Sequence, residues 1–446
     1  MSHRNLVWIL AVFLFVLLLW HAPDTVMRHR SFYNVFAPLA DIRAQIHKNY
    51  VEDVQDEQLL EGAVQGMVQG LDPFSRYIPP DELETFNQQT SGMVPGIGIF
   101  LTVENGILKV ISPVENSPAY KAGILPGDRI MGIDGEPTKT MSLFDAAARL
   151  RGQPGTTVVI EVEHELTETT ERLTLQRAEV RIHSVKGYVR SPDGGWDYRI
   201  DPDQGIGYVR VTSFTEETPH ELADVLVKLR SEPIKALIID LRFNPGGLLQ
   251  SAVDIANYFI DEGPIVSTKG KWAKPMVLNA SSENTFPPVP MVVLVNQYSA
   301  SAAEIVAGAL KDHHRATLIG VRTFGKGSVQ SVFPLDGGQG ALKLTTAYYY
   351  LPSGRNIHRR ANSDEWGVDP AIEIRLTGPE LIELQQARAQ ADVLYTGEPN
   401  GEETAERPPV PVLIDRQLQR ALELLRAQLA PATTPAATTA PAEKAS

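Results

Sequence analysis

The chain has 446 residues, 43% of them hydrophobic, so it is long enough to form two or three domains with buried cores. Its formal net charge of −13 argues against nucleic acid as a partner, because phosphate binding requires a basic surface. The absence of cysteine excludes thiol catalysis, thiolate metal sites and disulfides. No histidine and glutamate pair has metalloprotease spacing, so the sequence implies neither a metal nor another cofactor.

The N-terminal run from Leu6 to Trp20 is apolar and uncharged. As a helix it would span about 22 Å, which is shorter than the ~30 Å hydrocarbon core of a bilayer. No small-residue cleavage site follows it, so we predict that residues 1–25 form an uncleaved membrane anchor; the alternative is a cleaved signal peptide. Arg28 and Arg30, which lie beyond the run, weaken the positive-inside argument for an exported chain.

Residues 30–91 have apolar residues at helical spacing and predict a small helical region. The residues that carry this pattern are Leu39, Ile42, Ile46, Tyr50, Leu60, Val64, Met67 and Val68. Residues 92–180 differ, because short β-rich runs alternate there with Gly, Pro, Asn and Asp. This second pattern predicts a compact β-rich module.

Residues 181–377 contain the apolar runs IGYVRVTSF, ALIIDLRFNPGGLL and MVVLVNQY, each with turn residues at its end. Helical patterns lie between these runs, at residues 221–229 and 249–259. The alternation predicts an α/β core with buried strands. Residues 378–429 return to helical patterns, and the Ala/Thr/Pro-rich residues 430–446 predict a disordered tail.

The segment NQYSASAAEIVAGALKDHHRATLIGVRTFGKGSVQ, residues 296–330, carries the candidate chemistry. Ser301 precedes an apolar helical stripe, and the free N–H groups at a helix start suit an oxyanion. If residues 326–330 are extended, Lys326 and Gln330 share one face. These three residues indicate a Ser–Lys hydrolase, although Ser301 with Glu304 also fits a helix-capping box, and Lys326 and Gln330 fit an ordinary turn and strand.

The same segment resembles the signature of the carboxyl-terminal processing (tail-specific) serine protease family, which reads roughly N-x-x-S-A-S-A-S-E followed by G-K-G-x-V-Q. The resemblance implies that Ser301 is the nucleophile, that Lys326 is the general base and that Gln330 holds the lysine. Ala303 replaces a frequent third serine of the family, which is not the nucleophile. An amine with a pKa near 10.4 is a poor base at neutral pH, so this mechanism requires burial to lower the pKa of the lysine.

DLRFNPGG, residues 240–247, resembles the D-L-R-x-N-P-G-G stretch of the same family, with Phe243 where asparagine is frequent. A glycine N–H can face a scissile carbonyl, so Gly246 and Ala302 are the expected backbone donors of the oxyanion hole. Without the protease signature, this stretch would indicate only a turn. AYYYLPSGRNIH and GVDPAIEI also match the family, with Ala371 replacing an aspartate, and we assign no chemistry to them.

The β-rich module resembles a PDZ domain through PGIGIFL and SPAYKAGILPGDRIMGIDG. Gly96 and Gly98 would let backbone N–H groups converge on a terminal carboxylate, Ile97 and Ile99 would line a side-chain pocket, and the following strand would accept a peptide by β-augmentation. Arg151 is placed like an arginine that couples the PDZ domain to the protease in some relatives. The alternative is a β-module whose glycines serve only turns.

We therefore predict a multidomain chain with an α/β (crotonase/ClpP-like) protease core, a preceding PDZ domain, and helical N- and C-terminal segments. The function expected from the resemblance is serine endopeptidase cleavage near the C-termini of exported proteins, with the substrate tail captured by the PDZ domain. Expected partners are proteins with unstructured apolar C-termini, an activating adaptor, a second copy of the chain, and the bacterial inner membrane, with the catalytic part in the periplasm. Gating by a PDZ ligand or adaptor would leave the resting enzyme inactive.

Two other functions remain open at the level of the sequence. One is a Ser/His/Asp hydrolase that uses His313 or His314, which we otherwise expect at a solvated helix end. The other is a non-catalytic PDZ scaffold on the membrane, which would bind tails without cleaving them.

Overall fold

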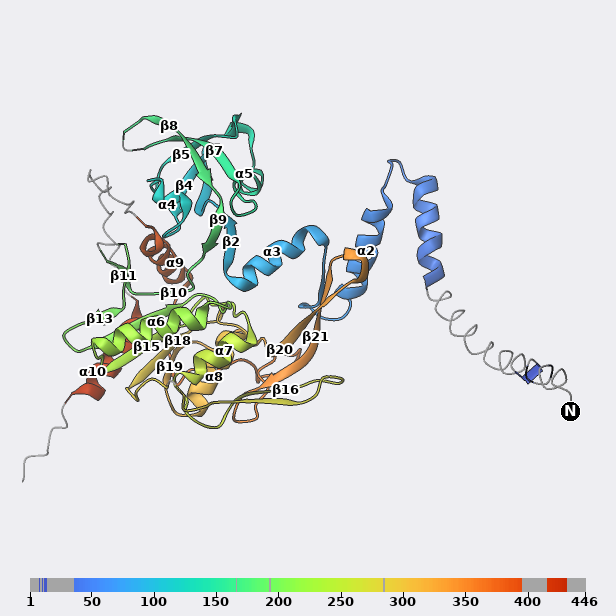
Figure 1. Ribbon diagram of the computed structural model, residues 1–446. Coiled ribbons are helices and arrows are strands. Elements are labelled where there is room, and N and C mark those ends of the chain that lie inside the picture. The colour runs from blue at the N-terminus through green and yellow to red at the C-terminus, as the bar shows by residue number, and fades with distance from the viewer. Residues whose placement is uncertain are drawn as a thin grey trace, which may run out of the picture. The chain divides into compact units, whose positions relative to one another are not determined.

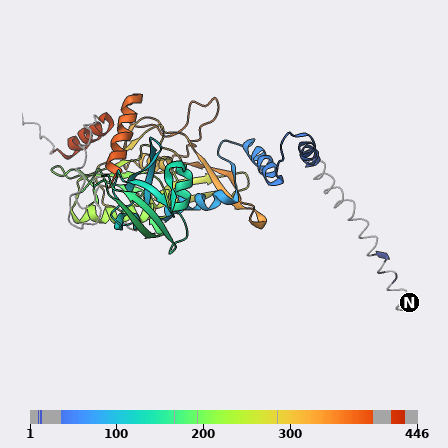
Figure 2. The same cartoon turned by 90° about the horizontal axis from the view of Figure 1, so that it is seen from above.

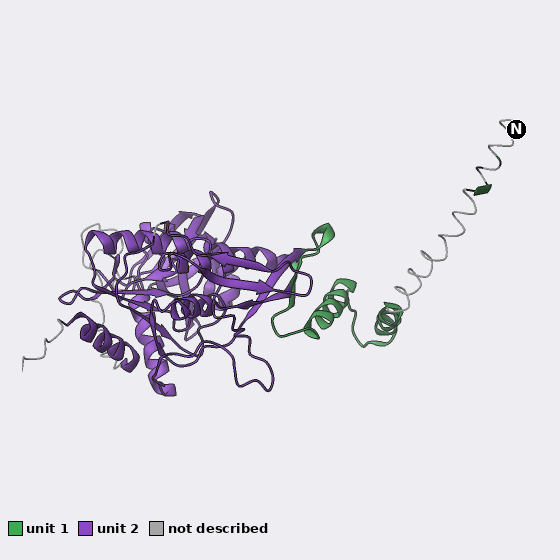
Figure 3. Ribbon diagram, turned by 90° about the horizontal axis from the view of Figure 1, so that it is seen from below, with its two compact units in different colours: residues 1–79, 334–343 green, residues 80–333, 344–446 purple. Residues whose placement is uncertain are grey.

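The computed structural model describes residues 36–165, 167–191, 194–283, 285–394 and 415–430, together with residues 8, 10, 12 and 13. The chain divides into two compact units, residues 1–79 with 334–343 and residues 80–333 with 344–446 (Figure 3). Within the described residues, no helix is long and apolar enough to cross a membrane. Most of residues 1–25 and 430–446 lie outside the described residues, so the predicted anchor and the predicted tail stay predictions.

The first unit combines helices with a short strand pairing. Residues 36–49 are helical and are followed by α2 (Asp56–Gln69). Hydrogen bonds from Arg43 and His47 join the two helices at Asp56 and hold the pKa of that carboxyl well below its ordinary value. β1 (Arg76–Ile78) pairs in antiparallel register with residues 341–343, at the start of β21 (Ala341–Tyr350) and after the short 3-10 helix η2 (Asp336–Gly338).

The second unit begins with α3 (Pro80–Ser91) and the β-rich module (Figure 1 and Figure 2). The module contains β2 (Met93–Gly96), β3 (Ile99–Glu104), β4 (Ile107–Pro113), α4 (Pro118–Lys121), β5 (Arg129–Ile133), β6 (Glu136–Pro137), η1 (Thr138–Thr140), α5 (Leu143–Leu150), β7 (Thr157–Glu163), β8 (Thr170–Gln176) and β9 (Ala178–Arg181). Its main sheet has the order β3-β4-β5-β7-β8, and β2 pairs with β9. Apolar side chains that alternate along the strands, such as Val158, Ile160 and Val162, form a core of its own.

The rest of the second unit is the α/β core with the C-terminal helices. Its elements are β10 (Val185–Lys186), β11 (Val189–Arg190), β12 (Trp196–Asp197), β13 (Arg199–Asp201), β14 (Ile206–Val211), α6 (Thr218–Ser231), β15 (Ala236–Asp240), α7 (Leu249–Asn257), β16 (Pro264–Lys269), β17 (Met276–Asn279), β18 (Met291–Val295), α8 (Ala302–Asp312), β19 (Thr317–Gly320), β20 (Ser328–Pro334), β21, β22 (Ile372–Glu373), α9 (Gly378–Asp392) and α10 (Arg416–Leu429).

The sheet that positions the site has the order β10-β14-β15-β18-β19-β22, with parallel pairing from β14 to β22. Its central strands are buried along their whole length, because helices cover both faces. On one face, alternate residues such as Leu237 and Ile239 pack with α6, α7 and α8. On the other face, Ile238 packs in a cluster with Leu418 and Leu425 of α10. The predicted α/β core and β-rich module are therefore confirmed.

Candidate active site

Ser301 lies directly before α8, at the end of the loop that follows β18. Its backbone has φ 57° and ψ −117°, a conformation that is rare for a residue with a side chain and that is found at functional sites. The Ala302 N–H, at the first helical position, donates to no acceptor among the described residues. The structure therefore confirms that Ser301 stands at a helix start, with a backbone donor of that helix beside it.

Gly246 packs against this helix start. Its φ is +99°, and a Cβ atom there would lie 2.6 Å from the Cβ of Ser301 and 3.0 Å from the nitrogen of Ala302. Only glycine fits this approach without displacing the backbone around the serine. The structure thus brings together Ser301 and both residues of the predicted oxyanion hole.

The N–H group of Gly246 is already engaged, because it donates to Asn244 Oδ1 at 2.8 Å. Asn244 is fully buried, and its Nδ2 donates to the carbonyl of Val211 at 2.8 Å, which fixes the orientation of the amide. Of the two predicted oxyanion donors, only that of Ala302 is free of an acceptor within the described part of the chain. Use of the Gly246 N–H by a substrate would require this turn to rearrange.

Glu304 joins the serine to the lysine. It is fully buried on α8, and its Oε2 accepts the N–H of Ser301 and the N–H of Lys326, each at 2.8 Å. Its Oε1 accepts the N–H of Gly325 at 2.7 Å and the hydroxyl of Thr323 at 2.5 Å. Burial raises the pKa of Glu304, and these donors oppose that rise. Because both nitrogens bind the same oxygen, the backbone nitrogen of Ser301 and that of Lys326 are separated by at most twice 2.8 Å.

Tyr349 of β21 also touches both catalytic candidates. Its hydroxyl donates to the carbonyl of Lys326 and is hydrogen-bonded to the Ser301 side chain. Burial, followed by the charge of Glu304, raises the pKa of Tyr349 well above its ordinary value. The tyrosine therefore remains a neutral hydroxyl that helps to hold the lysine segment against the serine.

Lys326 and Gln330 lie in different elements. Lys326 lies in the loop before β20, which begins at Ser328, so the condition under which the two side chains would share one face of a strand is not met. The cause is local: Gly325 has φ +92°, and the backbone N–H groups of Gly325 and Lys326 bind Glu304 instead of a neighbouring strand. Gln330 Nε2 donates to Ser328 Oγ at 2.9 Å and to Thr345 Oγ1 at 3.3 Å, which leaves its Oε1 as the atom suited to a lysine ammonium group.

A buried ion cluster supports the loop that carries Gly246. Asp240, at the end of β15, binds Arg242 and also Arg388 of α9, and Arg242 binds Asp415 at the start of α10. Burial raises the pKa of Asp240, but the charges and hydrogen bonds of the two arginines outweigh it and hold that pKa well below its ordinary value. Arg388 also donates to the carbonyl of Arg242 at 3.1 Å and lies over the ring of Phe243.

The structure agrees with the predicted peptide groove of the PDZ domain for some of its residues and not for others. β3 is an edge strand of the described sheet, and α5 lies beside it, which is the arrangement that β-augmentation needs. Gly98 has φ +75°, and a Cβ there would lie 2.3 Å from the Cβ of Ser117. Ile97 is 1% exposed and packs in the module core, with Ile99 against it, so Ile97 does not line an open pocket here. Arg151 caps α5 and forms an isolated bridge with Gly96.

The histidines lie at the far end of α8 from Ser301. His313 is the C-terminal cap of the helix, and its Nε2 lies 2.8 Å from the carbonyl of Pro264. At about 1.5 Å of rise per residue, His313 is roughly 18 Å from the serine along the axis. A Ser/His/Asp arrangement with His313 or His314 is therefore excluded by this geometry.

Comparisons with known proteins agree with this arrangement of parts. The family model of peptidase family S41 matches residues 205–374, that of a PDZ domain matches residues 109–164, and that of the activating protease CtpB N-terminal domain matches residues 28–82. A carboxy-terminal-processing protease of Bartonella bacilliformis is 35% identical over 98% of both chains.

A carboxyl-terminal-processing protease of Synechocystis is 38% identical over 73% of this chain and 75% of its own. Among solved structures, a photosystem II D1 C-terminal processing protease is 30% identical, with a TM-score of 0.43, over 75% of this chain and 86% of that one.

Proposed function

Because the chain belongs to the carboxy-terminal-processing proteases of peptidase family S41, we propose that Ser301 and Lys326 form its catalytic dyad and that Gln330 orients the lysine. As a member of that family it is a serine-type peptidase with a PDZ domain. The crotonase/ClpP-like character of the core stays a prediction from the sequence.

In the proposed reaction, the neutral amine of Lys326 takes the proton of the Ser301 hydroxyl as its oxygen attacks the scissile carbonyl. The tetrahedral intermediate would place its negative oxygen at the start of α8, where the Ala302 N–H has no acceptor among the described residues. Collapse of the intermediate breaks the peptide bond, and the lysine ammonium returns its proton to the leaving amine. Water, deprotonated by the same amine, then attacks the acyl-enzyme, and the Ser301 oxygen leaves and takes its proton back from the ammonium of Lys326.

The observation that carries this proposal is the binding of Ser301 and Lys326 to one carboxylate oxygen of Glu304. The loop that holds the lysine and the helix that begins at the serine are thereby fixed to a single buried group. This contact fixes the backbone of Lys326 beside that of Ser301, which supports the proposal that the lysine side chain serves the serine as general base.

The PDZ domain is proposed to capture an unstructured apolar C-terminus and deliver it to the core. The open edge of β3 beside α5 supports this role. Gating is proposed on the bond between the Gly246 N–H and Asn244 Oδ1, because a resting enzyme with that bond offers only one oxyanion donor. Loss of one such donor typically reduces kcat by about 10²–10³-fold.

The remaining elements of the proposal concern location and assembly. We propose that residues 1–25 anchor the chain in the bacterial inner membrane, with the catalytic part in the periplasm, or that they are cleaved as a signal peptide. The match of residues 28–82 to an activating-protease N-terminal domain supports a role in activation or self-association. A homodimer and an activating adaptor remain part of the proposal on this ground.

The test is cleavage of an unstructured protein that ends in a free apolar C-terminus, followed by mass spectrometry of the products. Wild-type chain is compared with Ser301→Ala and with wild-type chain acting on a C-terminally amidated twin substrate. Cleavage that is lost in the variant and weakened by amidation supports Ser301 as the nucleophile together with tail capture. Binding of the tail without cleavage, under conditions that include candidate adaptors, would favour the scaffold function.

A further inference from the structure

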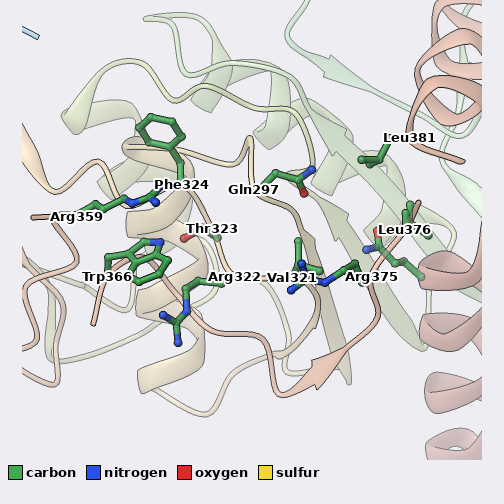
Figure 4. A pocket seen from close by; sticks show the side chains of 11 residues that line it. Gln297, Val321, Arg322, Thr323, Phe324, Arg359, Trp366, Arg375, Leu376 and Leu381 are labelled. Atoms are coloured by element: carbon green, nitrogen blue, oxygen red, sulfur yellow. The ribbon is translucent and has the colours of Figure 1, made fainter. Parts of the chain in front are cut away.

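A cationic pocket of about 350 Å³ lies in the core beside the segment that leads to Lys326 (Figure 4). The residues that matter for its chemistry are Gln297, Arg322, Phe324, Arg359, Trp366 and Arg375. Of the described residues that line it, none is acidic, although the whole chain has a net charge of −13. The pocket is therefore a local positive site on an acidic protein.

Trp366 is held between two guanidinium groups. The Cζ of Arg322 lies 4.6 Å and that of Arg359 lies 4.8 Å from the ring, and Figure 4 shows them on opposite sides of it. The ring packs on Gly325, because a Cβ there would lie 2.8 Å from Trp366 Cδ1. The N–H of Arg359 donates to the carbonyl of Gly325 at 2.8 Å. The arginine and tryptophan platform is thus attached to the residue before Lys326.

The arginines differ in how far their charges are satisfied. Arg322 binds Asp369 and the carbonyl of Asp364. Arg375 forms an ion pair with Glu373 at 3.2 Å, but their side chains are 80% and 63% exposed. Solvent therefore weakens the attraction, and the pair holds the charge of Arg375 only loosely. No carboxylate of the described residues forms an ion pair with Arg359, which is exposed and stacked on the tryptophan. The fork of Arg359 is therefore available to an external acid.

The pocket wall is joined directly to the catalytic candidates. The hydroxyl of Thr323 in this wall binds Glu304 Oε1, while Glu304 Oε2 binds the N–H of Ser301. Gln297, on another wall, belongs to the loop that runs from β18 to Ser301. A peptide bound at Ser301 would therefore have the pocket within a few residues of its scissile bond.

We propose that this pocket is a subsite of the core that binds a carboxylate of the peptide substrate. That carboxylate is either the side chain of an aspartate or glutamate near the cut or the terminal carboxylate of the fragment released. The planar guanidinium group binds carboxylates with two parallel hydrogen bonds, and the tryptophan orients Arg359 for that contact. The proposal rests on the proposed peptidase function and adds a specificity element in the core to the tail recognition assigned to the PDZ domain.

The test measures peptide binding to full-length Ser301→Ala chain, so that no cleavage interferes. Labelled peptides with an apolar background are prepared as matched pairs that have Glu or Gln at successive positions, and a free or an amidated C-terminus. Each pair is titrated by fluorescence anisotropy against the parent chain, Arg359→Met, Arg359→Lys and Arg360→Met. Arg360 is the matched control, because it neighbours Arg359, lies over Tyr348, and does not line the pocket.

We expect at least one acidic peptide to bind the parent chain about tenfold more tightly than its neutral twin, as for a charged hydrogen bond. This ratio should fall to about one in Arg359→Met, lie between the two in Arg359→Lys, and stay unchanged in Arg360→Met. If the Glu peptide binds more tightly than its Gln twin, the bound group is a side-chain carboxylate. If the free C-terminus binds more tightly than the amidated one, and this preference depends on Arg359, the bound group is the terminal carboxylate. The PDZ contribution cancels, because it is the same in all variants.

Equal ratios in the parent chain and in Arg359→Met, with both variants folded by thermal melting, overturn the proposal. The proposal is also overturned if, among the peptides that the wild type cleaves, every acidic peptide binds the parent chain no more tightly than its neutral twin. Failure of the proposed function appears elsewhere, as the absence of Ser301-dependent cleavage by the wild-type chain.

Discussion

Replacement of Glu304 by glutamine tests the positioning role of this carboxylate. All groups that the structure places against it are donors: the N–H groups of Ser301, Gly325 and Lys326 and the hydroxyl of Thr323. A glutamine has one acceptor oxygen and one NH₂ group in the same volume. At least one donor must therefore lose its acceptor.

The orientation with the smallest loss is defined by the same contacts. With the NH₂ group at the Oε2 position, the N–H groups of Ser301 and Lys326 both lose their acceptor. At the Oε1 position, the N–H of Gly325 loses its acceptor, while the hydroxyl of Thr323, which already accepts the N–H of Val368, can accept from the NH₂ group but loses the acceptor of its own proton. One buried unsatisfied donor costs about 1–3 kcal/mol of stability, and removal of a buried charge offsets part of this cost. The lysine loop shifts, and misplacement by about 1 Å reduces kcat roughly 100-fold.

The assay combines steady-state kinetics on a fluorogenic peptide with urea unfolding. Glu221→Gln is the matched control, because Glu221 is also a buried glutamate on a helix, and it accepts the N–H groups of Ser184 and Val185 rather than those of Ser301 and Lys326. Both variants should lose stability, but only Glu304→Gln should lose kcat while KM changes little. The positioning role would be refuted if Glu304→Gln kept a kcat within about twofold of wild type while Gly325 and its neighbours kept their wild-type structure.

Three further predictions follow from single contacts. Gly246→Ala should abolish activity and destabilise the chain by about 1–3 kcal/mol by unfolding measurements, because the new Cβ would lie 2.6 Å from the Cβ of Ser301; full activity would contradict this. Asp392→Asn should destabilise by about 3 kcal/mol at pH 7, because it leaves the buried guanidinium of Arg210 and the partly buried ammonium of Lys186 without their carboxylate. Burial raises the pKa of Asp392, but its cationic partners lower it overall, so the difference from wild type should be complete above pH ~4 and be lost progressively as pH falls through the lowered pKa of the folded state; a pH-independent difference would oppose this. Arg388→Met should reduce kcat about tenfold with little change in KM, since its contacts hold the loop before the oxyanion donor; a raised KM with unchanged kcat would indicate only impaired binding.

Local signals account for what the sequence predicted correctly. The apolar spacing after Ser301 defines a helix start, and the α/β alternation defines the core, because both depend on neighbouring residues. The proximity of Gly246 to Ser301 came from family resemblance rather than from spacing. It depends on two loops that lie at the ends of the neighbouring parallel strands β15 and β18.

Long-range contacts explain what the sequence analysis missed. Glu304 fitted a helix-capping box, and only the fold shows that it also binds the lysine loop. Tyr349 lies in a motif to which no chemistry was assigned, although its hydroxyl touches both catalytic candidates. The sequence did not decide whether residues 326–330 form one strand, and the backbone bond to Glu304 places Lys326 in a loop before β20. The S-x-x-E spacing was the one signal that could have indicated a second role for Glu304.

The most direct test of the account compares kcat for Lys326→Ala with kcat for the double variant His313→Ala/His314→Ala on the same peptide. Lys326→Ala should lose about 10²–10⁴-fold in kcat, as expected for removal of a general base, and should still bind the substrate tail. The double histidine variant should retain wild-type kcat, because these residues lie at the opposite end of α8. Full activity without the lysine, or its loss without the histidines, would contradict a Ser–Lys protease.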